Sequence, residues 1–155
     1  MSADVVSLTI PLITMDAAEP IVRSVVIALN KEQISDAVDQ FADRFTFTDH
    51  ALGLEFTEKG RLIDFFCKLR ELQPDASMKI VSIFQAEDNL AAEWELTATQ
   101  EESSGHFCRR RPIYLQGVTV VQVKNGRITR WSDFYDQVQS RRVELAALFK
   151  DWVEY

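Results

Sequence analysis

Two aspartates lie in strand-like segments where a carboxylate could leave water and take part in acid–base chemistry. Asp133 alternates with Trp131 and Tyr135, so the three side chains share one face of a strand. Asp49 alternates in the same way with Phe47. If these faces point inward, desolvation raises the pKa of each carboxyl toward neutrality, which favours a general acid or base. The pattern therefore makes Asp133 and Asp49 candidate catalytic residues.

Each aspartate also has a purely structural interpretation. Asp133 could accept hydrogen bonds from a neighbouring tyrosine or tryptophan and fasten the helices to the sheet. Asp49 could cap the turn expected at residues 50–53, because aspartate side chains commonly accept hydrogen bonds from turn backbone. The sequence alone leaves both interpretations open.

Aromatic side chains near these acids are candidates for lining a small-molecule pocket. They could present flat apolar surface to a small hydrophobic ligand, or they could be ordinary core residues. The substrate-binding candidates are Phe47, Trp94, Tyr114, Trp131 and Tyr135. Of these, Tyr114 could also donate a hydrogen bond to a substrate oxygen.

Other reactive groups are scarce. The 155 residues include two histidines and two cysteines, and none of them has metal-ligand spacing. Signatures for phosphate loops, dinucleotide sites and serine hydrolases are absent from the sequence. We therefore expect neither a metal nor a cofactor, and any chemistry falls to carboxylates and aromatic side chains.

Composition limits the class of protein. Seventeen basic and 24 acidic residues give a net charge of −7, which disfavours nucleic acid as a partner. The apolar run at residues 5–15 is too short and too polar to cross a membrane, and it lacks signal-peptide features. Two cysteines imply no disulfide framework, so we expect a cytoplasmic protein. The basic run at residues 109–111 could bind an anion, but pairing with Glu101 and Glu102 across a hairpin is favoured.

Helical periodicity dominates the first half of the chain. Apolar residues recur at helical spacing after Asp16, which begins a capping pattern, and again in a short helix from Ile34 to Phe41. A strand at residues 44–50 separates these from a third helix, which is expected between a Thr57 cap and Pro74.

The second half alternates with a period of two, which indicates strands. The expected strands cover residues 78–85, 90–100, 113–123 and 128–135, with a polar loop at residues 101–105. Asn125-Gly126 is a strong hairpin signal. A terminal helix is expected to turn an apolar side inward, made of Val143, Leu145, Leu148, Phe149 and Trp152.

Helices followed by an antiparallel meander indicate an α+β fold. We expect a curved antiparallel sheet wrapped around the helices as a cone, with one deep pocket between the two layers. Small molecules commonly bind in pockets of that kind.

Three segments carry a resemblance to a known superfamily. They are ALNKEQISDAVDQFADRFTFTDH at residues 28–50, GRLIDFF at residues 60–66 and GVTVVQVKNGRITRWSDFYD at residues 117–136. In this order and spacing the chain resembles the nuclear transport factor 2-like superfamily with its cystatin-like cone. That group includes SnoaL-like polyketide cyclases, limonene epoxide hydrolases and ketosteroid isomerases. The resemblance implies one SnoaL-like domain at residues 16–155, after an N-terminal extension at residues 1–15.

The resemblance carries over unevenly to the site residues. Asp49 matches the proton-shuttling acid of the isomerases, but Val25 and either Gly117 or Val118 stand where their oxyanion donors would be. Asp133 matches an acid of the epoxide hydrolases, whose arginine partner has no counterpart here. The SnoaL-like pattern needs only the acid at Asp133.

The resemblance therefore implies a cofactor-independent enzyme that acts on a small hydrophobic carbonyl or polyketide-like compound. A non-catalytic protein that binds a small hydrophobic ligand in the same pocket is the alternative. The resemblance also implies a homodimer formed through the outer face of the sheet.

Overall fold

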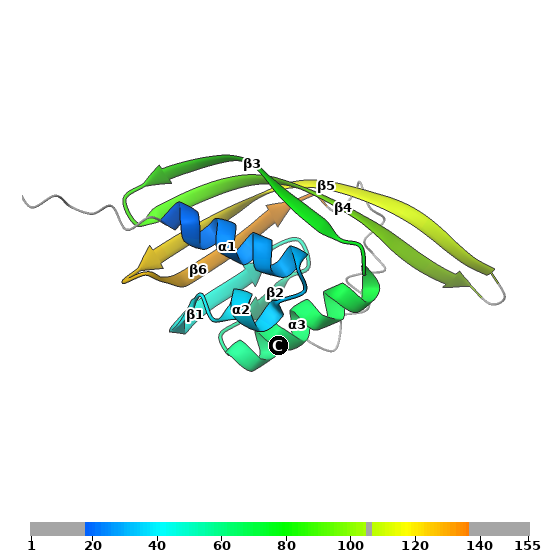
Figure 1. Ribbon diagram of the computed structural model, residues 1–155, viewed down its shortest axis with the longest axis horizontal. Coiled ribbons are helices and arrows are strands. Elements are labelled where there is room, and N and C mark those ends of the chain that lie inside the picture. The colour runs from blue at the N-terminus through cyan, green and yellow to red at the C-terminus, as the bar shows by residue number, and fades with distance from the viewer. Residues whose placement is uncertain (1–17, 105–106, 137–155) are drawn as a thin grey trace, which may run out of the picture.

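In the part of the chain that the structure describes, six strands form one sheet that carries three helices on a single face (Figure 1). The computed structural model describes residues 18–104 and 107–136. The helices are α1 (Ala18–Asn30), α2 (Ile34–Val38) and α3 (Lys59–Leu72). The strands are β1 (Phe41–Asp49), β2 (Leu54–Phe56), β3 (Ser77–Ala86), β4 (Asn89–Ser104), β5 (Phe107–Lys124) and β6 (Arg127–Tyr135). This arrangement confirms the expected α+β class.

The strand order β2-β1-β6-β5-β4-β3 places β1 and β6, the first and last strands of nine residues, side by side inside the sheet. All neighbouring strands are antiparallel except β1 and β6, which run parallel. Their register sets Phe47 opposite Trp131 and Asp49 opposite Asp133. The backbone amide of His50 extends the pairing by donating to the Asp133 carbonyl at 3.0 Å. The two candidate acids thus come from distant parts of the chain to adjacent positions.

The core lies between the helices and the inner face of the sheet. Helix α1 buries Val22, Val25 and Val26, which follow the helical spacing seen in the sequence. Helix α3 buries Leu62 and Phe65 against aromatic residues of the strands. Burial of this apolar surface is the main force that holds the helical layer on the sheet.

Strands β4 and β5 form a long hairpin that extends beyond the rest of the sheet (Figure 1). They pair continuously from Asn89 opposite Gln122 to Ser104 opposite Phe107. The loop expected at residues 101–105 is therefore strand as far as Ser104. The register sets Glu101 opposite Arg110 and Glu102 opposite Arg109, as the favoured interpretation predicted. Residues of opposite charge that face each other across two strands favour strand pairing, so the polar composition of this segment was not sufficient evidence for a loop.

Three further boundaries differ from expectation. Helix α3 begins at Lys59 after Glu58, and no side chain caps it, so Thr57 is not its cap. Helix α2 ends at Val38, and Phe41, which was expected on its apolar face, belongs to β1. The short strand β2 was not expected, since three residues are too few to show a period. The predicted terminal helix, the extension at residues 1–15 and the Asp16 cap lie outside the described residues.

Candidate functional site

The carboxyl group of Asp133 is held on one side by two hydrogen-bond donors. Thr119 Oγ1 donates to Asp133 Oδ1 at 2.5 Å from the neighbouring strand β5, where Thr119 is the cross-strand partner of Asp133. Trp131 Nε1 donates to the same oxygen at 2.9 Å. Within residues 18–104 and 107–136, no hydrogen bond reaches Oδ2. One oxygen is therefore fixed, and the other keeps its capacity to hold or accept a proton.

The Thr119 hydroxyl has only one proton to donate, and a second tryptophan determines where that proton points. Trp94 Nε1 donates to Thr119 Oγ1 at 2.8 Å, and both residues are buried. Because Thr119 accepts this bond, its own proton is directed to Asp133. The chain Trp94–Thr119–Asp133 crosses three neighbouring strands, β4, β5 and β6. Buried polar groups linked in this way fix one another's geometry.

A close packing contact makes room for Trp94. Its cross-strand partner on β5 is Gly117, and a Cβ atom there would lie 2.4 Å from Trp94 Cζ2 and 2.8 Å from the Phe134 carbonyl oxygen. The indole therefore lies against bare backbone, and any side chain at position 117 would displace it.

Burial governs the ionisation of Asp133. Desolvation raises the pKa of Asp133 to about 7, and the nearby charge of Asp49 adds to the rise. The hydrogen bonds from Thr119 and Trp131 oppose it by stabilising the ionised form. At neutral pH this carboxyl group is thus poised between its acid and base forms, as general acid–base catalysis requires.

Asp49 is more completely paired than Asp133. It is buried at the end of β1, and its Oδ2 accepts a 2.7 Å hydrogen bond from the Tyr135 hydroxyl. Its Oδ1 accepts a 2.8 Å bond from the backbone amide of Leu52. The capping interpretation of Asp49 is therefore correct, and the same carboxylate also faces the site through Tyr135. The Tyr135 ring packs edge-on against Trp94 at 5.6 Å, which brings the two networks together.

The predicted aromatic residues divide into three groups. Phe47, Trp94 and Trp131 are at most 4% exposed and belong to the packed core. Phe47 and Trp131 stack with their ring planes 12° apart, below the two aspartates on β1 and β6. Tyr135 is partly buried and joins the site through Asp49. Tyr114 is 47% exposed and lies on the outer face of β5, opposite to the face that carries Thr119.

Thr119 was missed as a site residue in the sequence. It lies in an alternating apolar segment, where a threonine is typical of any strand and indicates no functional role. Strand alternation is the sequence feature that indicates its position, because Thr119 shares a face with Gly117 and Val121. These two residues pair with Tyr135 and Trp131, which point inward. Recognising it requires the β5–β6 register, which the Asn125-Gly126 turn suggests but does not fix across the bulge near Gln122.

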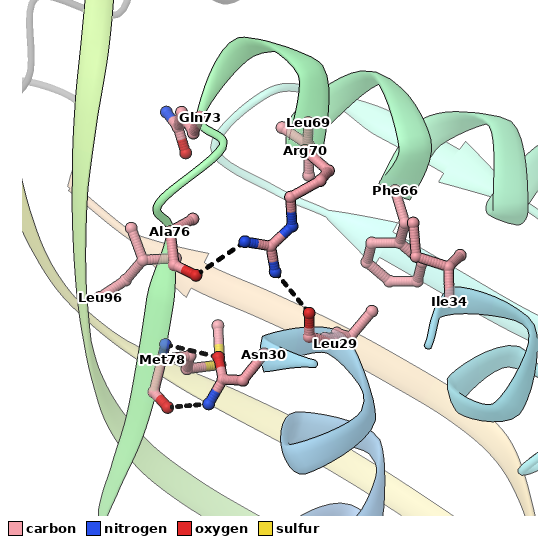
Figure 2. A pocket seen from close by; sticks show the side chains of 10 residues that line it. All are labelled: Leu29, Asn30, Ile34, Phe66, Leu69, Arg70, Gln73, Ala76, Met78 and Leu96. Carbon is pink, nitrogen blue, oxygen red and sulfur yellow. Dashed lines mark hydrogen bonds between the residues drawn. The ribbon is translucent and has the colours of Figure 1, made fainter. Parts of the chain in front are cut away.

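A cavity of about 110 Å³ opens on the inner side of the molecule, between α3 and the ends of α1 and β3 (Figure 2). Its lining is mostly apolar and includes Phe66, which packs edge-on against Phe47 at 5.5 Å. The two aspartates are not among its lining residues. The residues that line it are Leu29, Asn30, Ile34, Phe66, Leu69, Arg70, Gln73, Ala76, Met78 and Leu96.

The sequence of this chain matches a known domain family over most of its length. The sequence model of the SnoaL-like domain matches residues 22–131. The chain belongs to the SnoaL-like domain family. No curated protein matches it.

Solved structures share the fold at low sequence identity. A hypothetical protein from Catenulispora acidiphila with a ketosteroid isomerase-like fold, in complex with trimethylamine, is 18% identical, with a TM-score of 0.70 over 88% of this chain and 98% of that one. A proposed SnoaL-like polyketide cyclase from Shewanella putrefaciens is 15% identical, with a TM-score of 0.68 over 81% and 95%. TerC, co-crystallised with polyporic acid, is 12% identical, with a TM-score of 0.68 over 86% and 99%. These likenesses show that this SnoaL-like protein has the α+β cone fold that the sequence led us to expect.

Residues 18–104 and 107–136 contain neither a candidate membrane span nor a candidate metal-binding cluster. No helix among them is long and apolar enough to cross a bilayer. In the same part of the chain, no group of three or more His, Cys, Asp or Glu side chains is arranged so that it could hold a metal ion.

Proposed function

We propose that this SnoaL-like protein is a cofactor-independent acid–base enzyme acting on a small hydrophobic carbonyl or polyketide-like compound. The reaction would be a cyclisation, an isomerisation or a hydration. The observation that carries the proposal is the state of Asp133, whose carboxyl group combines a pKa of about 7 with one fixed oxygen and one oxygen unbonded within the described chain.

The proton transfer follows from this geometry. Asp133 Oδ2 would take a proton from the carbon next to a substrate carbonyl, and the electrons of the broken C–H bond would move to the carbonyl oxygen as an enolate. Thr119 and Trp131 hold Oδ1, so the carboxyl group keeps its orientation as it changes charge. Return of the proton to a different carbon of the conjugated enolate completes an isomerisation. Attack of the enolate carbon on a second carbonyl within the substrate closes a ring, and the alkoxide that forms takes the proton back from Asp133.

Asp49 and the aromatic residues have supporting roles in the proposal. The charge of Asp49 keeps the pKa of Asp133 high, and its bond from Tyr135 places a hydroxyl beside the site, where water or substrate could be oriented. Phe47, Trp94 and Trp131 supply the apolar surroundings that desolvate Asp133.

Exchange of carbon-bound hydrogen tests the proposal without knowledge of the natural substrate. A panel of small cyclic ketones and 1,3-diketones is incubated in D2O, and loss of the α-proton signals is followed by NMR. We expect the wild-type protein to accelerate exchange of at least one compound, and Asp133→Asn to reduce that acceleration by about a hundredfold. Equal rates with wild type and Asp133→Asn would reject Asp133 as the proton carrier.

A non-catalytic binding protein is the second candidate. The observations that favour it are the separation of the aspartates from the lining of the cavity and the tight packing of the predicted pocket residues. In that case a bound compound is recovered chemically unchanged after long incubation. Its conversion to a product would exclude this second function.

The outer face of the sheet supports a further proposal, that two copies of the chain associate there in the cytoplasm. Val118 and Phe134 are cross-strand partners on that face and are 39% and 43% exposed, and the ring of His50 stacks on Phe134 at 4.2 Å. Exposed apolar side chains grouped in this way are typical of interaction surfaces. Size-exclusion chromatography with light scattering measures the mass; a dimer that Phe134→Lys dissociates supports the surface, and a monomeric wild type contradicts it.

A further inference from the structure

The cavity between α1, α3 and β3 contains a polar side chain that has no hydrogen-bond partner in the described part of the chain. Gln73 is 6% exposed and lines the cavity, and no hydrogen bond joins its side-chain amide to any residue of 18–104 or 107–136. Its backbone is fully used, because its amide donates to the Leu69 carbonyl and its carbonyl accepts from Ala76. An amide buried without hydrogen bonds destabilises a fold, so its presence requires a reason.

The other polar side chains of the cavity, Arg70 and Asn30, already hydrogen-bond to the backbone. Arg70 donates through Nη1 to the carbonyls of Pro74 and Ala76 and through Nη2 to that of Leu29. Leu29 lies in the last turn of α1, where the helix dipole favours a positive charge. Arg70 therefore joins the ends of α3, α1 and β3, and its charge is balanced by backbone dipoles.

Asn30 closes the same corner of the fold. Its side chain accepts from the amide of Met78 at 2.9 Å and donates to the Met78 carbonyl at 2.8 Å. Figure 2 shows the hydrogen bonds of Arg70 to Ala76 and Leu29 and those of Asn30 to Met78 as dashed lines, and it draws none from Gln73 to the other labelled residues. Of the three polar side chains in the lining, Gln73 is the one that makes no hydrogen bond to residues 18–104 or 107–136, so its whole amide is available to a ligand.

The remaining lining sets the size and character of that ligand. The cavity is apolar apart from these groups, and its volume of about 110 Å³ is somewhat below that of an engineered cavity that binds benzene, about 150 Å³. It is open on one side, so it can hold one small ring while other atoms extend outward. Arg70, the ionised side chain of the lining, already donates to three backbone carbonyls, which favours a neutral compound over an anion.

We propose that this cavity is a binding subsite for a small neutral ring compound that carries a hydroxyl or carbonyl oxygen, which hydrogen-bonds to the side-chain amide of Gln73. A carbonyl accepts from Nε2, and a hydroxyl can in addition donate to Oε1. This subsite does not depend on proton transfer by Asp133, which is not part of its lining.

Phenol and toluene are matched probes for this subsite, because they have similar shape and differ by a hydroxyl in place of a methyl group. Their binding is measured by NMR of the methyl groups of Leu29, Leu69 and Met78, which line the cavity. We expect phenol to shift these signals saturably and to bind at least about fivefold more tightly than toluene, because only phenol satisfies the buried amide. Phenol that shifts none of them, or that binds no better than toluene, would overturn the proposal.

Substitution of Gln73 separates recognition of the oxygen from simple filling of an apolar space. Gln73→Leu removes the amide, so we expect the preference for phenol to disappear and the melting temperature of the free protein to rise. Gln73→Met is the second variant if Gln73→Leu does not fold. A preference for phenol that survives either folded variant would contradict the assignment.

Two controls locate the binding. Ala76→Leu reduces the cavity, so it should weaken both probes; undiminished binding would place them elsewhere and overturn the subsite. Asp133→Asn should leave phenol binding unchanged, since its carboxyl does not line the cavity. Loss of phenol binding in Asp133→Asn would contradict the independence of the subsite. Failure of ketone exchange with intact phenol binding would reject only the proposed catalysis.

Discussion

Asp49 and Asp133 are register partners on the parallel strands β1 and β6, and their carboxyl groups have different hydrogen-bond surroundings. Asp49 accepts from Tyr135 and from the backbone of Leu52, one bond to each oxygen. Asp133 accepts both of its bonds on a single oxygen. Two neighbouring acids in unlike environments are a recurring basis for separate acid and base roles.

The raised pKa of Asp133 makes protein stability depend on pH. Between about pH 4 and pH 7 the native state holds a proton on Asp133 that the unfolded chain releases, so the free energy of unfolding falls as pH rises. Asp133→Asn cannot lose that proton. The variant should therefore gain about 2 kcal/mol relative to wild type between pH 4 and pH 8, with allowance for solvent screening at this partly exposed side chain.

Chemical denaturation at both pH values measures this difference. Asp43→Asn, on the exposed part of β1, controls for the loss of one surface carboxylate. If wild type and Asp133→Asn keep the same difference in free energy at both pH values, Asp133 is not protonated in the native state.

Thr119 lowers the pKa of Asp133 through its hydrogen bond, so its removal should raise that pKa further. Thr119→Val keeps the side-chain shape but removes both the donor to Asp133 and the acceptor for Trp94 Nε1. We expect the midpoint of the Asp133 carboxyl titration, measured by 13C NMR, to rise above about 7. The unpaired indole N–H should cost about 1–3 kcal/mol of stability. Thr97→Val, on the exposed face of β4, should change neither quantity.

Tyr135 and Tyr114 lie on opposite faces of the sheet, so removal of each hydroxyl gives a matched comparison. Tyr135→Phe removes the donor to Asp49, which leaves a buried carboxylate oxygen without that bond and should cost about 1–3 kcal/mol of stability. Tyr114→Phe acts on an exposed side chain of the outer face and should change stability by less than about 0.5 kcal/mol. Thermal or urea unfolding distinguishes them, and equal effects would contradict the assignment of Tyr135 to the site.

Gly117 is needed for the packing of Trp94 against β5. Gly117→Ala places a methyl group on the Trp94 indole and close to the Phe134 carbonyl, so the ring must move and the bond to Thr119 must lengthen or break. We expect a loss of about 1–3 kcal/mol from overpacking, together with a change in tryptophan fluorescence. Gly60→Ala, where a Cβ atom would meet nothing within 4 Å, is the control. A Gly117→Ala protein with unchanged stability and fluorescence would show that the close approach is not maintained in solution.

The fold was predictable because its elements carry strong periodic signals. The stripe of Val22, Val25 and Val26 marked α1, and the alternation of Trp131, Asp133 and Tyr135 marked the inner face of β6. The extent of the β4–β5 hairpin was underestimated, since its polar tip has no apolar alternation and depends on pairing with a distant segment. Element existence follows from local pattern, whereas length and register depend on the partner strand.

The site was predictable only in part for the same reason. Asp133 and Asp49 were marked by their apolar neighbours on the same faces, but their pairing required the parallel contact of β1 with β6, which local sequence does not encode. Thr119 and Gln73 acquire their roles only from the groups that surround them in space. Tyr114 was included on residue type, and the alternation of β5 places it on the outer face.

The pH dependence of ketone α-proton exchange is the most direct test of the central claim that Asp133 carries the proton. For a compound that the wild type turns over, the rate should rise with pH to a plateau, with a midpoint near 7 that matches the Asp133 carboxyl titration. Asp49→Asn should move both midpoints to lower pH, because it removes the charge that raises the pKa of Asp133. An exchange rate whose midpoint does not follow the titration of Asp133, or that persists undiminished in Asp133→Asn, would contradict the account.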